Sequence, residues 1–145
     1  MAKAKLSEAP DTEYILSDFN GFEFPKKYNA VVSSLSLHHL ETDREKLGFY
    51  KKIYSCLKEG GVFVNADVVL GSTDALQELY MDKWRSFMYG SVGRDETEGK
   101  WIPKYYEEDR RVSLTEHLKM LKEAGFTAID VVWKYYNYAV YTAVK

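Results

Sequence analysis

The sequence predicts an α/β fold in which a mostly parallel sheet ends in an antiparallel hairpin. Residues 28–40 form an apolar stretch that leads into a polar loop, residues 43–61 have helical periodicity, and residues 62–69 are apolar again. Strand, helix and strand in this order make a βαβ unit, which implies a parallel sheet with helices on its faces. The two strands expected on either side of Asn137 are joined too closely for a crossover, so they predict an antiparallel pair.

Composition restricts the classes of protein to consider. The chain has 145 residues, of which 46% are hydrophobic and 29% charged, and its net charge is −2. This size predicts one domain over residues 1–145, with about 73–111 as a helical or lid insertion. The absence of a basic excess argues against a nucleic-acid partner, and no stretch approaches the roughly 18 apolar residues of a membrane span. The single cysteine, Cys56, and the absence of an apolar leader predict a reducing cytoplasm as the location.

The first part of the chain predicts a helix tail, a short strand and a loop. Residues 1–9 are good helix formers stopped by a proline, and residues 12–18 are expected to form a strand that ends at Asp18. Residues 19–27 contain glycine and proline and predict a loop. The next strand, which starts at Tyr28, has a continuous apolar centre, which indicates burial on both faces.

Two capping boxes predict where helices begin, at Thr42–Glu45 and Ser113–Glu116. In such a box the hydroxyl and the carboxylate satisfy free backbone amides of the first turn. Glycines predict where these helices end, because they accept the left-handed conformation of a helix stop: Gly60 and Gly61 for the first helix, and Gly125 for the second.

An aromatic-rich segment lies between these two helices. Residues 73–88 are expected to form a helix with a broad aromatic face, whereas residues 89–111 have an irregular, charged pattern typical of a lid or loop. Aromatic side chains suit the walls of a covered pocket for a small or partly apolar acceptor, although ordinary core and lid packing explains them equally well. The candidate acceptor-binding residues are Tyr80, Trp84, Trp101, Tyr105 and Tyr106.

Polar side chains gather where the two predicted parallel strands end, and ligands of open α/β sheets bind at this place. They are Ser33, Ser34, His38 and His39 after the first strand and Asn65 and Asp67 in the second. Histidine titrates near neutrality, so His39 is a candidate general base, and Asp67 could orient a substrate or take a proton. The alternatives are a packed structural histidine and a strand-end cap or salt bridge. No spacing matches a zinc site, and adjacent histidines point to opposite sides, so no metal is expected.

The chain as a whole resembles the last two thirds of class I S-adenosylmethionine-dependent methyltransferases. The family's fourth-strand motif is similar to FPKKYNAVVSSLSLHHL, and its fifth-strand motif is similar to LKEGGVFVNADVV. The family's closing helix and hairpin are similar to LKEAGFTAIDVVWKYYNYAVY, and its third strand with the preceding helix is similar to MAKAKLSEAPDTEYILSDF. The resemblance covers essentially the whole chain, with the motifs in order.

This resemblance implies a Rossmann-like methyltransferase sheet in truncated form. It implies S-adenosylmethionine as cofactor, if the site is completed, and methyl transfer to an unidentified small-molecule acceptor. By resemblance, Asp18 and Phe19 match positions that meet the adenine, and Ser34 and Leu35 match positions beside the cofactor. By the same resemblance, Asp67 faces the acceptor.

One departure from the family changes these expectations. The family's first strand with its glycine-rich loop is missing, and so is the second strand with its ribose-binding acid; no G-x-G occurs in the sequence. In the family, strands one and two separate the third strand from the fourth, so the Tyr28 strand should be an open sheet edge. A second copy in a homodimer, the missing segment as a separate polypeptide, or the Thr12 strand moved inward could pair with this edge.

Two other functions stay open at this point. One is a non-catalytic, truncated methyltransferase-fold domain that acts through dimerisation or partner binding at the exposed sheet edge. The other, less well supported, is a redox enzyme on a Rossmann-like sheet, which would need the same missing glycine loop. Cofactor binding separates the methyltransferase from the non-catalytic alternative.

Overall fold

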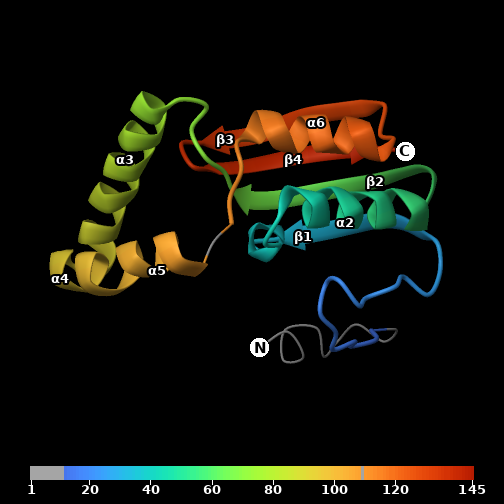
Figure 1. The fold of residues 1–145 in the computed structure, drawn as a ribbon, viewed down its shortest axis with the longest axis horizontal. Helices are drawn as coiled ribbons and strands as arrows, with labels where there is room; N and C mark the ends of the chain where they lie inside the picture. Colours follow the sequence, from blue (N-terminus) through green and yellow to red (C-terminus); the bar gives the residue numbers. More distant parts are fainter. Residues whose placement is uncertain (1–11, 109) are drawn as a thin grey trace.

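The computed structural model describes residues 12–108 and 110–145, so the helix predicted over residues 1–9 lies outside the described residues. A four-stranded sheet has the order β1-β2-β4-β3 (Figure 1). The strands are β1 (Tyr28–Ser34), β2 (Leu57–Val68), β3 (Ala128–Tyr135) and β4 (Tyr138–Val144). β1 and β2 are parallel, and β4 runs antiparallel to both β2 and β3, so the predicted α/β fold with its C-terminal hairpin is confirmed.

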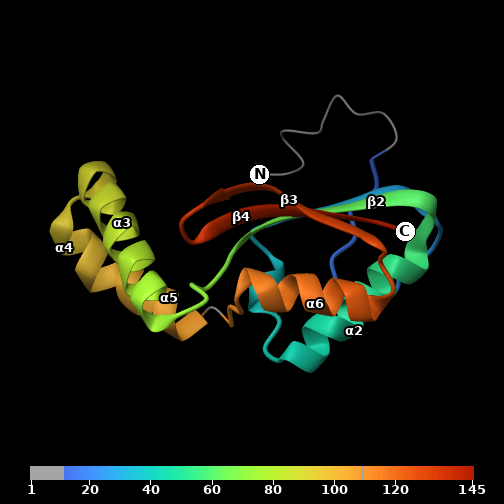
Figure 2. The same ribbon diagram turned by 90° about the horizontal axis from the view of Figure 1, so that it is seen from above.

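Two helices cover one face of this sheet. Both α2 (Asp43–Cys56) and α6 (Leu114–Ala124) lie on the same side in Figure 2. The capping box of α2 is complete, because Thr42 Oγ1 accepts from the Glu45 amide at 3.2 Å and the Glu45 carboxylate accepts from the Thr42 amide at 2.9 Å. Only the serine half of the second box forms, since Ser113 Oγ accepts from the Glu116 amide.

The first helix ends earlier than its glycines predict. α2 stops at Cys56, and β2 begins directly at Leu57. Gly60 does have a positive φ of 72°, but it lies within β2, where the register with β1 shifts. The glycine pair therefore makes a bulge in a strand, a role that also needs the left-handed conformation, instead of a helix stop.

The predicted strand over residues 12–18 is wrong, because these residues are in no ladder with the described part of the chain. The following loop is instead held against α2. The Phe19 ring packs edge-on against Phe49 with centroids 5.1 Å apart, and Lys52 Nζ donates to the Phe22 carbonyl at 3.0 Å. The open edge of β1 lies across the same groove as Ile15, Ser17 and Asp18, but these residues form no ladder with it.

The segment predicted as irregular, residues 89–111, is largely helical. It contains the end of α3 (Asp74–Val92), then α4 (Arg94–Glu96), the π-helical turn η2 (Thr97–Trp101) and α5 (Ile102–Glu108). These helices lie beyond the carboxyl ends of β1 and β2 (Figure 1). Gly93, with φ 85°, allows the chain to turn between α3 and α4, which the charged sequence pattern did not reveal.

Both ends of this helical segment meet at the end of the sheet. The Leu70 amide donates to the Val112 carbonyl at 3.0 Å, and Leu70 forms a parallel bridge with Ser113. Residues 71–111 therefore leave the sheet and return to it at one point. No helix among residues 12–108 and 110–145 is long and apolar enough to cross a membrane.

Only one face of the sheet is buried. On the face beneath α2 and α6, Phe63 and Tyr141 are fully buried against Ile53 and Leu121. On the other face Val32 is 72% exposed, so the burial predicted for both faces of the Tyr28 strand is wrong. β1 pairs only with β2 among the described residues, which confirms that it is a sheet edge.

Candidate active site

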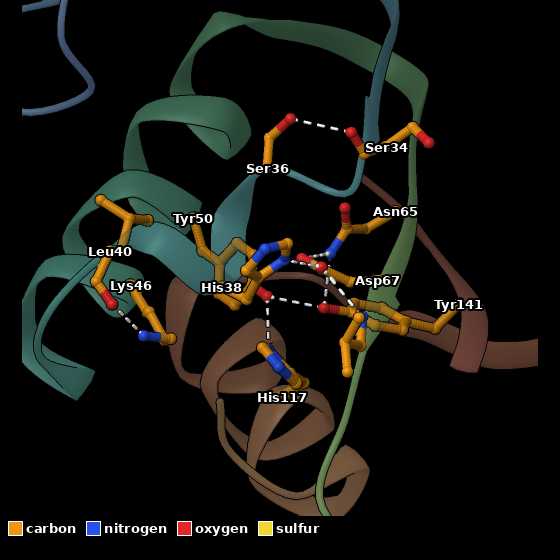
Figure 3. Close-up of polar contacts among 11 residues, drawn as sticks. Ser34, Ser36, His38, Leu40, Lys46, Tyr50, Asn65, Asp67, His117 and Tyr141 are labelled. Carbon is orange, nitrogen blue, oxygen red and sulfur yellow. Dashed lines mark hydrogen bonds and ion pairs between the residues drawn. The ribbon is translucent and has the colours of Figure 1, made fainter. Parts of the chain in front are cut away.

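A buried histidine–aspartate pair lies where the two parallel strands end (Figure 3). His38 belongs to a short 3-10 turn, η1 (Leu37–His39), and its Nδ1 contacts Asp67 Oδ1 of β2. Asp67 is 1% exposed, and its Oδ1 also accepts from the Val68 amide at 2.9 Å. A carboxylate on Nδ1 holds the neutral ring in the tautomer with its proton there, so that the basic lone pair is on Nε2.

An unusual turn directs His38 to Asp67. Leu35, directly after β1, has a φ of 49°, which a non-glycine residue rarely adopts. Its amide donates to the Ala66 carbonyl at 2.8 Å, which ties the turn to β2, and Ser36 Oγ donates to the Ser34 carbonyl at 2.8 Å. The chain is thereby bent at the strand end, and strain of this kind often occurs at functional sites.

Behind Asp67, a chain of buried hydrogen bonds crosses the core to α6. Asn65 Nδ2 donates to Asp67 Oδ2 at 3.3 Å and to the Tyr141 hydroxyl at 2.7 Å. The Tyr141 and Tyr50 hydroxyl oxygens are 3.0 Å apart, and the Tyr50 hydroxyl is 2.7 Å from His117 Nδ1 (Figure 3). The sheet and the helices that cover it thus both contribute to one polar cluster.

The donors of this chain can all point towards α6. The Asn65 amide nitrogen is a pure donor, so the Tyr141 oxygen accepts from it, and the Tyr141 proton can then go to Tyr50. In this arrangement Tyr50 donates to Nδ1 of His117, and the proton of the neutral imidazole is on Nε2. Burial lowers the pKa of His117 to about 4 and raises the pKa of Tyr50 and of Tyr141, so all three stay uncharged near neutral pH.

A buried lysine balances the charge of Asp67. Lys46 of α2 is 1% exposed, and its Nζ donates to the Leu40 carbonyl (Figure 3). Burial lowers the pKa of Lys46, while the negative charges of Asp43 and Asp67 act in the opposite direction. A buried carboxylate requires such compensation, because transferring an unpaired charge from water into the core is costly.

An open groove of about 350 Å³ runs along the free edge of β1. Its lining includes three of the residues predicted to meet the cofactor, Asp18, Phe19 and Ser34, but not Leu35, whose side chain is exposed. The Gly21 amide, 2.7 Å from Asp18 Oδ1, is the main reason why the pKa of Asp18 is lowered. A carboxylate beside an aromatic ring suits a purine, which offers an exocyclic amine and a flat face.

The two adjacent histidines have different environments. His39 is exposed and its ring lies 4.1 Å from that of His38, which is the imidazole that contacts Asp67. Sequence reasoning selected His39 and named Asn65 and Asp67 at the strand end, but it did not find the other members of the polar cluster behind Asp67, which are Lys46, Tyr50, His117 and Tyr141. The sequence does indicate that Asn65 and Asp67 lie together, because they are two residues apart in a strand and so share a face of the sheet.

The aromatic candidates are only partly brought together. Trp84 packs on Tyr105 with centroids 5.2 Å apart, and Tyr106 lies edge-on to Tyr105. Tyr80 instead accepts from Lys134 Nζ at 3.0 Å, and Trp101 Nε1 donates to Glu96 at 3.2 Å. Within the described ranges, no group of three or more His, Cys, Asp or Glu residues could hold a metal ion.

Comparison with known proteins finds similarity to methyltransferases. The family model for a methyltransferase domain matches residues 1–65. The carboxy-S-adenosyl-L-methionine synthase of Nautilia profundicola is 30% identical over 138 residues, which are 92% of this chain and 56% of that protein. An uncharacterized methyltransferase of Bacillus thuringiensis is 40% identical over 76 residues, which are 52% of this chain and 34% of that protein.

The chain is similar to S-adenosylmethionine-dependent methyltransferases. Its fold is similar to the crystal structure of the methyltransferase SibL in its apo form, with a TM-score of 0.66 at 14% identity over 99% of this chain and 39% of that one. The chain spans 56% of the length of its Nautilia relative. The cofactor of the family is S-adenosylmethionine.

Proposed function

We propose that this chain forms part of an S-adenosylmethionine-dependent methyltransferase site that acts on a small-molecule acceptor. The observation that carries the proposal is the buried contact between His38 and Asp67 at the carboxyl ends of adjacent parallel strands. Ligands of open α/β sheets bind at that place, and a histidine with a carboxylate on Nδ1 is poised to accept a proton at Nε2. In this proposal His38, and not His39, is the general base.

The residues that line the β1 groove fit one end of the cofactor. S-adenosylmethionine supplies a methyl group already activated by its sulfonium, so the protein mainly needs to orient the two reactants. Asp18 and Phe19 would hold the adenine through the carboxylate and the ring, and Ser34 lies in the same groove. His38 would take the proton that an acceptor hydroxyl or amine loses, and Asp67 would stabilise the imidazolium that forms.

We also propose that another polypeptide segment completes this site along β1. The edge of β1 and the neighbouring face, which carries Val32, are both open. A second copy that paired its own β1 across a two-fold axis would satisfy the edge but leave that face uncovered. A segment that brings both strands and helices would cover both surfaces, and the Nautilia relative is long enough to contain one.

Calorimetric titration with S-adenosylhomocysteine tests the cofactor proposal. One-site binding that weakens at least about tenfold in Asp18→Asn would support the proposal that the β1 groove binds the cofactor. The expected size follows because a charged hydrogen bond contributes about 1.5–3 kcal/mol. Transfer of a labelled methyl group into a metabolite extract should then be lost in His38→Gln and kept in the matched variant His39→Gln. Absence of binding at millimolar ligand would favour the non-catalytic alternative, a domain that acts through its sheet edge.

Two further measurements separate the remaining alternatives. Light scattering distinguishes a monomer from the homodimer, and a dimer with hydrogen-exchange protection along β1 would contradict the separate-segment proposal.

The name of the Nautilia relative, carboxy-S-adenosyl-L-methionine synthase, offers a second candidate reaction, modification of the cofactor itself. Mass spectrometry decides this point, because that product is the cofactor enlarged by a carboxyl group and methyl transfer instead leaves S-adenosylhomocysteine.

A further inference from the structure

The carboxylate of Asp67 is held at both of its oxygens. Oδ1 contacts Nδ1 of His38 and accepts from the Val68 amide at 2.9 Å, whereas Oδ2 accepts from Asn65 Nδ2 at 3.3 Å. In the part of the chain that the structure describes, Asn65 is the only residue that donates to Oδ2. A carboxylate held at one oxygen can still turn about its Cβ–Cγ bond, because this terminal torsion has broad minima. The Asn65 amide restricts that rotation.

The neighbours of Asn65 determine which way its amide faces. Asn65 is fully buried, and its Nδ2 also donates to the Tyr141 hydroxyl at 2.7 Å (Figure 3). A hydroxyl can donate as well as accept, so Tyr141 alone would also be satisfied if the amide oxygen and nitrogen exchanged places. The exchanged oxygen would face Oδ2 of Asp67, however, and two acceptors form no hydrogen bond. The carboxylate therefore selects the orientation that presents a donor to it, and Oδ1 of Asn65 is left without a partner among the described residues.

Regular strands, rather than a loop, place these three side chains. Asn65 and Asp67 are alternate residues of β2, so both point to the buried face of the sheet. Tyr141 lies directly opposite Asn65 in the register of β2 with β4. Supports built on paired strands hold a side chain more precisely than supports on loops do. The Asn65 amide is therefore in place before any ligand binds.

We propose that Asn65 is a positioning residue for the candidate base His38 and acts on it through Asp67. By holding Oδ2, Asn65 keeps Oδ1 on Nδ1 of His38. The imidazole proton then stays on Nδ1 and the basic lone pair on Nε2, which is the tautomer that can accept a proton at Nε2. This role rests on the proposed function, in which His38 takes the proton of the acceptor.

Nitrogen NMR of the full 145-residue chain, without cofactor, tests the proposal because it distinguishes the two neutral tautomers of His38. We expect the proton on Nδ1 in the unsubstituted chain. Asn65→Leu keeps a similar side-chain volume but lacks the donor, so the ratio of the Nδ1–H to the Nε2–H tautomer should fall at least about tenfold, since a hydrogen bond to a charged group is worth about that factor or more. Asp67→Asn is the positive control, because its amide can donate to Nδ1 and thereby move the proton to Nε2.

The matched control is Tyr141→Phe, which removes the other partner of Asn65 but leaves its bond to Asp67. A purely structural role predicts similar tautomer ratios in Tyr141→Phe and Asn65→Leu, because both variants disturb the same buried cluster. That result, an unchanged ratio in Asn65→Leu, or a proton on Nε2 in the unsubstituted chain would overturn the proposal. Circular dichroism identifies a variant that has unfolded, and Asn65→Ser, whose side chain is one bond shorter, then replaces Asn65→Leu.

Titration with S-adenosylhomocysteine separates this proposal from the proposed function. Asn65→Leu should lose transfer of the labelled methyl group but keep the affinity for S-adenosylhomocysteine, because Asn65 is not among the residues that line the β1 groove. The expected tautomers without any S-adenosylhomocysteine binding would retain the positioning role and reject the methyltransferase proposal. S-adenosylhomocysteine binding with a tautomer ratio that does not respond to Asn65→Leu would reject the positioning role alone.

Discussion

The face of the sheet beneath α2 and α6 and the opposite face are both rich in apolar residues, but only the first is closed (Figure 2). The closed face surrounds the polar cluster that ends at Asp67, and its apolar members such as Phe63 are fully buried. The open face exposes Val32, Trp133 and Tyr135. Alternation along each strand therefore produces two apolar faces, and only one of them has a covering layer among residues 12–108 and 110–145.

This difference separates what the chain can do alone from what it cannot. The closed face holds the candidate base and its supporting hydrogen bonds without help from other residues. The open face and the β1 edge both expose apolar side chains, and exposed apolar surface in soluble proteins marks candidate interaction sites. Variants on the two faces should accordingly behave differently.

The largest contrast is expected between two strand aspartates. Asp67→Ala should lower the free energy of unfolding by about 4 kcal/mol, because it removes the buried partner of His38 and one of the negative charges that act on buried Lys46. Asp130, on the open face, is exposed and accepts only from the Val131 amide, so Asp130→Ala should change stability by less than about 0.5 kcal/mol. Urea unfolding of both variants measures the contrast, and equal losses would mean that the open face is covered in solution.

An apolar pair should show the same contrast with a smaller effect. Ile53→Ala removes a side chain with no exposed surface and should cost about 3 kcal/mol in the free energy of unfolding. Val32→Ala should cost less than about 0.5 kcal/mol in the isolated chain. Thermal denaturation at two protein concentrations checks this, and a concentration-dependent loss for Val32→Ala would reveal self-association through the open face.

Acid should destabilise the closed face through His117. Its pKa is lowered from 6.5 to about 4, so the unfolded chain binds this proton more readily than the folded chain does. The stability contributed by neutral His117 is complete above pH 6.5 and is lost as the pH falls towards 4, by about 2 kcal/mol at pH 5. The pH dependence of urea unfolding should be shallower in His117→Asn and unchanged in the exposed control His39→Asn. Parallel curves for all three proteins would contradict the assignment.

The smallest expected effect tests the direction of the hydrogen-bond chain. Tyr141→Phe leaves the Tyr50 oxygen without its donor and Asn65 with a single partner, so it should cost about 1.5 kcal/mol in the free energy of unfolding. The matched variant on the open face, Tyr135→Phe, should be neutral. In nitrogen NMR spectra His117 should carry its proton on Nε2, and a proton on Nδ1 would mean that the donors run the other way.

Local sequence signals predicted most of the fold. The βαβ unit and the hairpin follow from periodicity over short stretches, and Thr42 and Glu45 mark a helix start by their own chemistry. The strand predicted over residues 12–18 failed because an apolar run becomes a strand only beside a partner. Gly60 was correctly expected to adopt a positive φ, but the sequence could not tell a helix stop from a bulge, because both need that conformation.

The candidate site was less predictable, because its parts come from distant elements. Asp67 could be selected from its position at a strand end. His38 and His39 could not be separated, since the left-handed turn at Leu35 decides which ring faces Asp67, and nothing in a leucine predicts it. Tyr141 reaches Asn65 only through the register of β2 with β4, which no local pattern specifies.

The bridge between Leu70 and Ser113 separates a part of the chain that can change during evolution from the sheet, which stays fixed. The chain leaves the sheet and rejoins it at one point, so the 71–111 excursion can be lengthened, shortened or exchanged without moving β2 or α6. Insertions between fixed, adjacent ends cost little stability, because loop-closure entropy grows only slowly with length. Natural selection can therefore alter this excursion while the His38–Asp67 pair stays the same, and a chimaera that receives the excursion from a relative should keep the parent sheet.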